Sequence, residues 1–207
     1  HIPSVATTRM RDELRGGLAY VRNHGSLMGL IVFAATTTFL GFAVITLLPI
    51  FAERVFQGGA GTFSWLLFSS GAGAVVGALV IAWLGQFKRM GRTVLLMQSL
   101  YGVLIMAFAA SRNLWLSLIL LFLIGAIQMM VFSSATSLVQ IIAPNEMRGR
   151  VVSIYMLAFR GGMPLGGLAS GYLATFVESP LVIGINGALL VVVAAFFLAR
   201  SHGVREL

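Results

Sequence analysis

Long apolar runs separated by short polar segments dominate the sequence. Residues 27–52 contain no charged side chain, and neither does the stretch between Arg54 and Lys88. About 20 apolar residues in an α-helix are enough to cross a hydrocarbon core about 30 Å thick. The pattern therefore predicts six membrane-spanning helices, at residues 27–52, 62–85, 93–111, 115–142, 151–176 and 181–199.

Composition agrees with an all-α integral membrane protein. Hydrophobic residues make up 58% of the chain and charged residues only 10%, whereas soluble domains carry about 25% charged residues. A net charge of +8 would suggest nucleic acid in a soluble chain. Here the basic residues lie between apolar runs, so we expect membrane lipids as partners and no nucleic acid.

The basic residues also predict an orientation. An even number of spans places both ends on one side, and that side holds all but three of the 14 Lys and Arg residues. Arg54 and Arg112 fall on the opposite side and Arg160 falls within a span. Since cytoplasmic loops are enriched in Lys and Arg, we expect both ends in the cytoplasm, as in a multi-pass protein of a bacterial inner membrane.

The residues ahead of the first span read as a separate segment. Met10, Leu14, Leu18 and Val21 recur at helical spacing, which predicts an amphipathic helix over residues 9–23, either on the membrane surface or in a solvated linker. We expect a cytoplasmic linker at 1–26, a transmembrane domain at 27–199 and a tail at 200–207. The chain begins with histidine and shows no signal peptide, which suggests a part of a longer polypeptide.

The six spans divide into two similar triplets. Residues 27–111 and 115–199 each cover 85 positions and each contain three predicted spans. Because three is odd, the second triplet enters the membrane from the opposite side. This is the inverted-repeat construction of many secondary transporters.

One charge interrupts the fifth span. Arg160 lies about ten residues beyond Arg150, near mid-depth at about 1.5 Å per residue, where an arginine costs roughly 2.5–3.5 kcal/mol and normally faces the protein interior or water. We therefore expect Arg160 to point inward. It either binds an anionic or catecholate-like substrate or forms an ion pair or gate between helices.

Residues for enzymatic chemistry are scarce. The histidines, His1, His24 and His202, lie outside the spans, and the sequence contains no cysteine. It also lacks the common hydrolase, metalloprotease and nucleotide-binding motifs. We expect no enzyme activity, no cofactor and no metal site.

Four segments resemble the major facilitator superfamily. The connector Gly77–Thr93 is similar to its cytoplasmic signature, with Gln86 near the position of the usual acid, and Pro144–Val151 resembles its P-x-E-x-R-G-R connector. Residues 162–167 resemble its glycine-proline antiporter motif, but with one residue fewer between Pro164 and the glycine pair. Residues 15–22 look like the lead into the second half of enterobactin exporters and macrolide efflux proteins.

The resemblance implies the C-terminal half of a twelve-helix secondary transporter, partnered by a missing N-terminal six-helix half. The implied function is an efflux permease or antiporter that exports small organic molecules, such as siderophores or drugs, by alternating access. No Asp or Glu lies within a predicted span, so a proton-coupled exporter would carry the titrating acid in the other half, and otherwise the protein is a facilitator. The alternative is a non-transporting assembly or sensor module with the same fold.

The resemblance also implies a central cavity lined by the first and fourth spans. The candidates for residues that line this cavity are the polar residues near mid-depth: Thr36, Thr37, Thr38, Gln128 and Arg160. The amide of Gln128 either orients a ligand or forms a hydrogen bond to a neighbouring helix. The candidates for cytoplasmic gates are Gly77, Gly85, Lys88, Arg89, Gly91, Arg92, Pro144, Glu146, Arg148, Gly149 and Arg150. The candidates for helix packing and hinges are Gly73, Gly162, Pro164, Gly166, Gly167 and Gly171.

Overall fold

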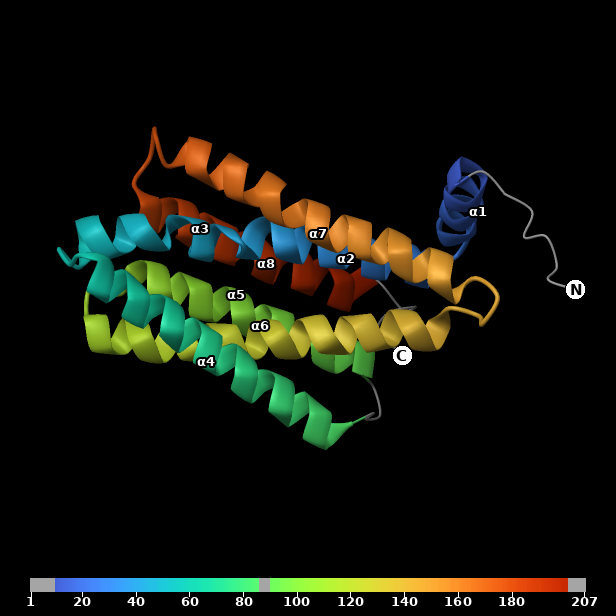
Figure 1. Cartoon of the computed structure of the whole chain (residues 1–207), viewed down its shortest axis with the longest axis horizontal. Helices are drawn as coiled ribbons and strands as arrows, with labels where there is room; N and C mark the ends of the chain where they lie inside the picture. The colour runs from blue at the N-terminus through green and yellow to red at the C-terminus, as the bar shows by residue number, and fades with distance from the viewer. Residues whose placement is uncertain (1–9, 86–89, 201–207) are drawn as a thin grey trace, which may run out of the picture.

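The computed structural model describes residues 10–85 and 90–200. In this part of the chain every regular element is a helix, and all but the first helix run along one common direction (Figure 1). The elements are α1 (Met10–Asn23), α2 (Gly25–Gly41), α3 (Ala43–Ile50), the π-helix η1 (Phe51–Val55), α4 (Ala60–Leu84), α5 (Met90–Ala110), α6 (Leu114–Ile142), α7 (Arg148–Leu173) and α8 (Ser179–Arg200).

Within residues 10–85 and 90–200, six helical segments are long and apolar enough to cross a membrane, so the predicted fold class is confirmed. They are Gly25–Val55, Ala60–Leu84, Met90–Ala110, Leu114–Ile142, Arg148–Leu173 and Ser179–Ala199. The fifth differs from the predicted 151–176. It begins at Arg148, directly after the turn at Pro144–Met147, where the Val151 N–H donates to the Met147 carbonyl at 2.9 Å. Arg148 and Arg150 therefore lie in the first turn of α7 and not in the connector.

The first span is not one regular helix, as the sequence pattern had suggested. Its parts α2 and α3 are separated by the single residue Phe42, which keeps a helical conformation and helical hydrogen bonds, and the span ends in the π-helix η1. Three consecutive threonines, Thr36, Thr37 and Thr38, donate to carbonyls of the preceding turn, a pattern that bends helices. Pro49 removes a backbone donor shortly before η1. These local features account for the irregular stretches of a span that stays helical from Gly25 to Val55.

Helix pairing follows the predicted inverted repeat. α4 packs along α6, α7 packs along α2, and α5 packs along α8. Exchanging the two triplets, α2–α5 and α6–α8, converts the α4–α6 pair into the α7–α2 pair and leaves α5–α8 unchanged. The two triplets thus use the same pairing.

Two buried clusters lie toward opposite ends of the bundle. One includes Leu30, Leu95 and Tyr155, and the other includes Leu48 and Phe108. Residues from the first span, α5 and α6 belong to both clusters. The clusters hold the two ends of the bundle, and Phe33 and Tyr155 of the first cluster also line the site described below.

Helix α1 lies across the end of the bundle (Figure 1). It contacts α7 and α2, and a Cβ placed on Gly17 would lie 3.2 Å from Cβ of Arg150. The predicted helix at 9–23 is present as Met10–Asn23. Its place on a membrane surface stays a prediction, and the tail beyond Arg200 lies outside the described residues.

Candidate functional site

Close contact between α4 and α6 forms one wall of the site. A Cβ on Gly73 or Gly77 of α4 would collide with the backbone carbonyls of Phe122 and Ala126 in α6. From the other side, a Cβ on Gly125 would collide with the carbonyl of Ser70. Small residues let helix backbones approach in this way in membrane proteins. Both helices therefore need glycine at this crossing.

The α2–α7 pair forms the opposite wall with a similar glycine pair. A Cβ on Gly162 would collide with the Thr38 hydroxyl and lie 2.9 Å from the carbonyl oxygen of Ala35. A Cβ on Gly166 would collide with the Phe39 carbonyl. Gly162 and Gly166 have the same four-residue spacing as Gly73 and Gly77, on the helix that is equivalent in the inverted repeat.

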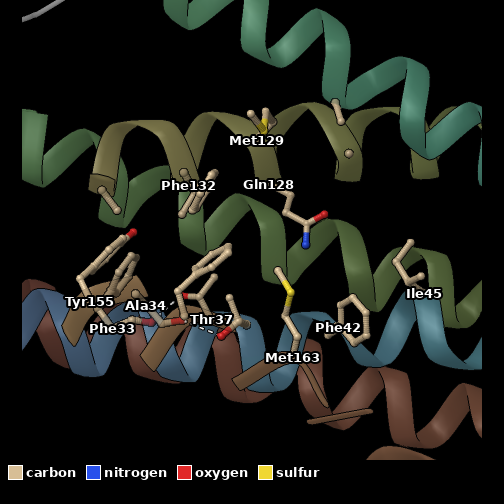
Figure 2. Close-up of a pocket in the computed structure, with 16 residues that line it drawn as sticks. Phe33, Ala34, Thr37, Phe42, Ile45, Gln128, Met129, Phe132, Tyr155 and Met163 are labelled. Atoms are coloured by element: carbon tan, nitrogen blue, oxygen red, sulfur yellow. Dashed lines mark hydrogen bonds between the residues drawn. The ribbon is translucent and has the colours of Figure 1, made fainter. Parts of the chain in front are cut away.

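A cavity of about 320 Å³ lies between these two pairs. Most of its lining residues come from the first span and α6, the two spans that the resemblance implied, and α7 adds three. Figure 2 shows the side chains of the opposing walls facing one another across this space. The lining residues are Phe33, Ala34, Thr37, Thr38, Phe42, Ile45, Ala74, Gly125, Gln128, Met129, Val131, Phe132, Ala135, Tyr155, Phe159 and Met163.

Aromatic rings and methionines dominate the cavity walls. The rings of Phe132 and Phe159 lie 4.2 Å apart between centroids, and Tyr155 stacks with Phe159 at 6.3 Å. Met129 and Met163 add flexible thioethers. Pockets for organic ligands are mostly apolar, with a few placed polar groups, and begin at about 300 Å³. This cavity fits that description.

The threonine hydroxyls of the cavity are already hydrogen-bonded. Thr37 donates to the Phe33 carbonyl at 2.7 Å, and Thr38 donates to the Ala34 carbonyl at 3.0 Å. Thr37 also accepts from Nε2 of Gln98 in α5 at 3.0 Å. Gln98 is fully buried, so this bond fixes Thr37 from behind the cavity wall.

Gln128 is the polar residue at the centre of α6. It is half-buried and lines the cavity, and its amide makes no hydrogen bond to the residues that the structure describes. Figure 2 shows Gln128 and Met163 pointing toward one another from α6 and α7. The amide therefore does not bond a neighbouring helix and is free to bind a ligand.

Arg160 does not occupy the predicted interior position. It is exposed on α7 and does not line the cavity. Since one residue turns a helix by about 100°, Arg160 lies about 60° around α7 from Met163, beside the cavity wall. The inward face of α7 is taken up by Gly162 and Gly166 against α2, which leaves no room there for a guanidinium group.

Thr36 also lies outside the main cavity. It lines a shallow groove on the other side of the α2–α7 contact, next to Gly161 and Gly162. Of the five predicted cavity residues, three line the main cavity: Thr37, Thr38 and Gln128.

The gate candidates occupy two different environments. Gly77 lies in the α4–α6 crossing, whereas Gly85 ends α4 with φ +60°, a conformation that favours glycine. Lys88 and Arg89 lie outside the described residues. Gly91 is buried in α5. The remaining candidates are exposed at the helix ends: Arg92, Pro144, Glu146, Arg148, Gly149 and Arg150.

The packing candidates also divide. Gly73, Gly162 and Gly166 lie in the crossings described above, and a Cβ on Gly167 would lie 3.0 Å from the Thr46 hydroxyl. Gly171 has open space beside it. Pro164 is exposed inside α7, which continues through it without interruption.

Several cavity residues were not found from the sequence. Gln98, which supports Thr37 from behind the wall, carries the same signal as Gln128, an amide within an apolar run, but it lies in the third span, and the resemblance implied a cavity lined by the first and fourth. Phe132, Tyr155 and Phe159 give no distinct signal, because aromatic residues occur throughout the spans. Their placement depends on how α6 and α7 pack.

The described part of the chain offers binding groups and no metal-ligand cluster of His, Cys, Asp or Glu. Comparison with curated proteins gives no match. A family model described as "transmembrane secretion effector", of the major facilitator type, matches residues 3–205. With its six candidate spans and this nearly complete match, the chain belongs to the transmembrane secretion effector family of major facilitator transporters.

Proposed function

We propose that this chain forms one six-helix half of a secondary transporter that exports small organic molecules, such as siderophores or drugs, by alternating access. The observation that carries the proposal is the mid-depth cavity with the free amide of Gln128. Substrate sites of such transporters lie near the bilayer midplane at the interface of structural repeats. Both glycine crossings flank this cavity, so either helix pair can move relative to the other around a bound substrate.

The exposed position of Arg160 is an argument that a partner covers this face of α7. It lies at the middle of the 26-residue helix, where contact with lipid is costly for a guanidinium group. A second six-helix unit, the N-terminal half expected from the sequence, would cover this face and place Arg160 at the border of a larger shared cavity. In that position Arg160 could contact substrate or pair with an acid of the other half.

The cytoplasmic gates of the proposal are the segments at 86–93 and 143–150, the second of which covers the turn after α6 and the first turn of α7. Arg148 and Arg150 lie in the first turn of α7, at the end of the bundle that α1 crosses. Arg150 contacts Met147 at 3.8 Å and packs beside Gly17 of α1. Movement of α7 would therefore also move these contacts, which are expected to face the cytoplasm of a bacterial inner membrane together with both ends of the chain.

The positions of the acidic residues bear on proton coupling. Of the acids whose side chains the structure describes, Glu53, Glu146 and Glu178 are all exposed at ends of helices or connectors. None lines the cavity. Proton coupling would therefore draw its titrating carboxylate from the partner half.

The test is export by the full-length protein reconstituted in vesicles, with ethidium and a catecholate siderophore as candidate substrates. Gln128→Ala and Arg160→Ala are each expected to reduce export at least several-fold, because loss of one hydrogen bond costs about 1 kcal/mol. The matched controls are Gln140→Ala, an exposed glutamine of the same helix, and Arg22→Ala, an exposed arginine of α1 outside the cavity and the proposed gates.

Two results would count against the proposal. Undiminished export in both variants would remove the cavity and Arg160 from the transport path. A folded protein that exports neither substrate, nor any other member of a wider panel of organic molecules, would favour the non-transporting membrane module.

A further inference from the structure

A second cavity, the outer cavity, lies at the end of the bundle opposite to α1 and has a volume of about 380 Å³. Its polar lining residues are Arg54, Arg112, Glu178 and Ser179. They come from η1, from the turn between α5 and α6, and from the start of α8, which lie at the same end of the bundle (Figure 1). Arg54 and Arg112 are the two arginines expected on the side away from the cytoplasm, where cations are rare. Both line this one cavity.

Packing fixes the backbone that carries the two arginines. Arg54 lies in η1, where the ring of Phe51 stacks on Phe108 of α5 at 4.9 Å between centroids, and both rings are fully buried. Arg112 lies in the short turn after α5. There Asn113 caps α6 by accepting from two backbone N–H groups of its first turn, at 2.9 and 3.3 Å. Both arginines are thus anchored to the same end of α5.

The charges of the outer cavity are not paired with one another. Arg54, Arg112 and Glu178 are exposed, and in the described part of the chain no ion pair joins the carboxylate to either guanidinium group. Two positive charges that line one cavity repel each other. Each guanidinium group also presents a planar fork of N–H donors that fits two oxygens of a phosphate group. An anion bound between the arginines would offset their repulsion.

Ser179 gives an independent indication of a ligand. Only 6% of its surface is exposed, yet its hydroxyl makes no hydrogen bond to the residues that the structure describes and is not sealed off from the cavity that it lines. Buried hydroxyl groups normally have a partner. Ser179 also begins the 22-residue helix α8, whose N-terminal end carries a partial positive charge. Its hydroxyl is therefore available to donate to an anion.

The remaining lining residues and the depth of the outer cavity favour a lipid. Arg54 lies one residue before the end of the span Gly25–Val55, and Ser179 begins the span Ser179–Ala199. The cavity therefore lies at the level of the phospholipid headgroups. Its other lining residues are apolar and can contact the start of an acyl chain: Ile50, Val55, Val177 and Pro180.

From this arrangement we infer a binding site for a phospholipid headgroup that carries both a phosphate and a primary ammonium group, as in phosphatidylethanolamine. Arg54, Arg112 and Ser179 donate to the phosphate oxygens. Glu178 accepts hydrogen bonds from the ammonium group, which explains why an acid lines the cavity together with two arginines. A choline headgroup has no N–H to donate, and a glycerol headgroup has no cation. The site is separate from the central cavity and does not depend on the proposed export.

Native mass spectrometry of the purified full chain tests the site by counting retained lipids. The protein is mixed with equal amounts of phosphatidylethanolamine, phosphatidylcholine and phosphatidylglycerol that share the same acyl chains. One phosphatidylethanolamine should be retained per chain, about fivefold in preference to either other lipid, as expected for one exposed charge contact. Glycerophosphoethanolamine, which has the same headgroup without acyl chains, should not displace the lipid at equal concentration.

Substitutions separate the phosphate contacts from the ammonium contact. Replacing Arg54 and Arg112 together by Gln should lower retention of all three lipids at least tenfold. Glu178→Ala should keep retention and abolish the preference for phosphatidylethanolamine. The matched controls are Arg22→Gln, an exposed arginine of α1 at the other end of the bundle, and Glu53→Ala, an exposed acid next to Arg54 that lines a different cavity. Both should behave like the unaltered chain.

The Ser179 hydroxyl is tested by Ser179→Ala, which should lower retention of all three lipids about fivefold. Normal retention in both this variant and the double arginine variant would show that lipid adheres elsewhere and would overturn the site. Tighter retention of phosphatidylglycerol, or a preference for phosphatidylethanolamine that survives Glu178→Ala, would overturn the headgroup class. Displacement by an equal concentration of glycerophosphoethanolamine would overturn the assignment to a lipid.

These measurements require no transport. Failed lipid retention with intact, Gln128-dependent export would therefore refute the lipid site alone. The expected retention in a protein without any export would refute the transport function and support the lipid site.

Discussion

The α4–α6 and α2–α7 pairs are equivalent in the inverted repeat, yet they differ in rigidity. Between α4 and α6, glycines on both helices face backbone of the partner, and both helices are continuous over 25 and 29 residues. In the α2–α7 pair, glycines come from α7 alone, Gly166 faces the Phe39 carbonyl, and Gly162 faces the Thr38 side chain and the Ala35 carbonyl. Because a side chain can rotate where a backbone cannot, we expect α4–α6 to be the rigid pair and α2–α7 the more deformable one.

The deformable pair also carries most of the chemistry. Thr37, Thr38 and Tyr155 lie on it, and Arg160 lies on its exposed face. The rigid pair contributes Gln128 from an uninterrupted helix. The comparison suggests that α4–α6 holds one side of the site in place while α2–α7 adjusts around the ligand.

The largest expected effect is at the rigid crossing. Gly73→Ala should destabilise the fold by roughly 3 kcal/mol, because the added Cβ meets the Phe122 backbone and neither helix has a break that could yield. Thermal unfolding in detergent measures the loss. Gly71→Ala is the control, since its Cβ would meet nothing. Equal melting temperatures for the two variants would contradict the account of this crossing.

The matching change in the deformable pair should cost less stability. Gly162→Ala is expected to lose about 1–2 kcal/mol, because the nearest atom to the added Cβ belongs to the Thr38 side chain, which can rotate, and the Ala35 carbonyl oxygen at 2.9 Å needs only a small shift. Its effect on export should exceed that of Gly73→Ala at equal amounts of folded protein. Gly161→Ala, with open space beside it, is the control. A greater loss of stability than in Gly73→Ala would reverse the comparison.

Gln98 offers a smaller test of the deformable wall. Gln98→Leu removes the bond that fixes Thr37, while Thr37 keeps its bond to Phe33. Export of ethidium should fall about fivefold and the unfolding free energy by about 1 kcal/mol or less. Vesicle flux and thermal unfolding measure the two. Ser99→Ala, which breaks only a bond within α5, should leave export unchanged. Unaltered export in Gln98→Leu would exclude a role for the Gln98–Thr37 bond.

The smallest effect is expected at the cytoplasmic end of α7. Replacing Arg148 and Arg150 together by Gln should slow export up to about fivefold, since exposed charge contacts contribute at most about 1 kcal/mol. Membrane insertion should stay normal. Flux into vesicles measures transport, and protease accessibility of the connectors measures membrane insertion. If the variant inserts wrongly, but the correctly folded fraction transports normally, the two arginines determine topology and are not part of a gate.

The helices could be predicted from the sequence because apolar length alone determines a span. The irregular residue at Phe42 and the π-helix η1 could not, since the threonines and Pro49 are tolerated in continuous helices as well. Gln128 was found because an amide in an apolar run is conspicuous. Arg160 was expected to point inward, and within this chain it is exposed on α7, because glycines occupy the face of α7 that packs on α2. A single charge in the sequence does not reveal which face that is.

Cysteine accessibility at Gln128 tests the central claim, a wet mid-depth cavity between the two pairs, most directly. The chain contains no cysteine, so Gln128→Cys introduces a single thiol. It should react with a charged methanethiosulfonate reagent, which requires water, and ethidium, a candidate substrate, should slow the reaction. Leu123→Cys, on the exposed face of α6 away from the cavity, should remain unreactive. A folded Gln128→Cys protein that resists the reagent from both sides of the membrane would contradict the account.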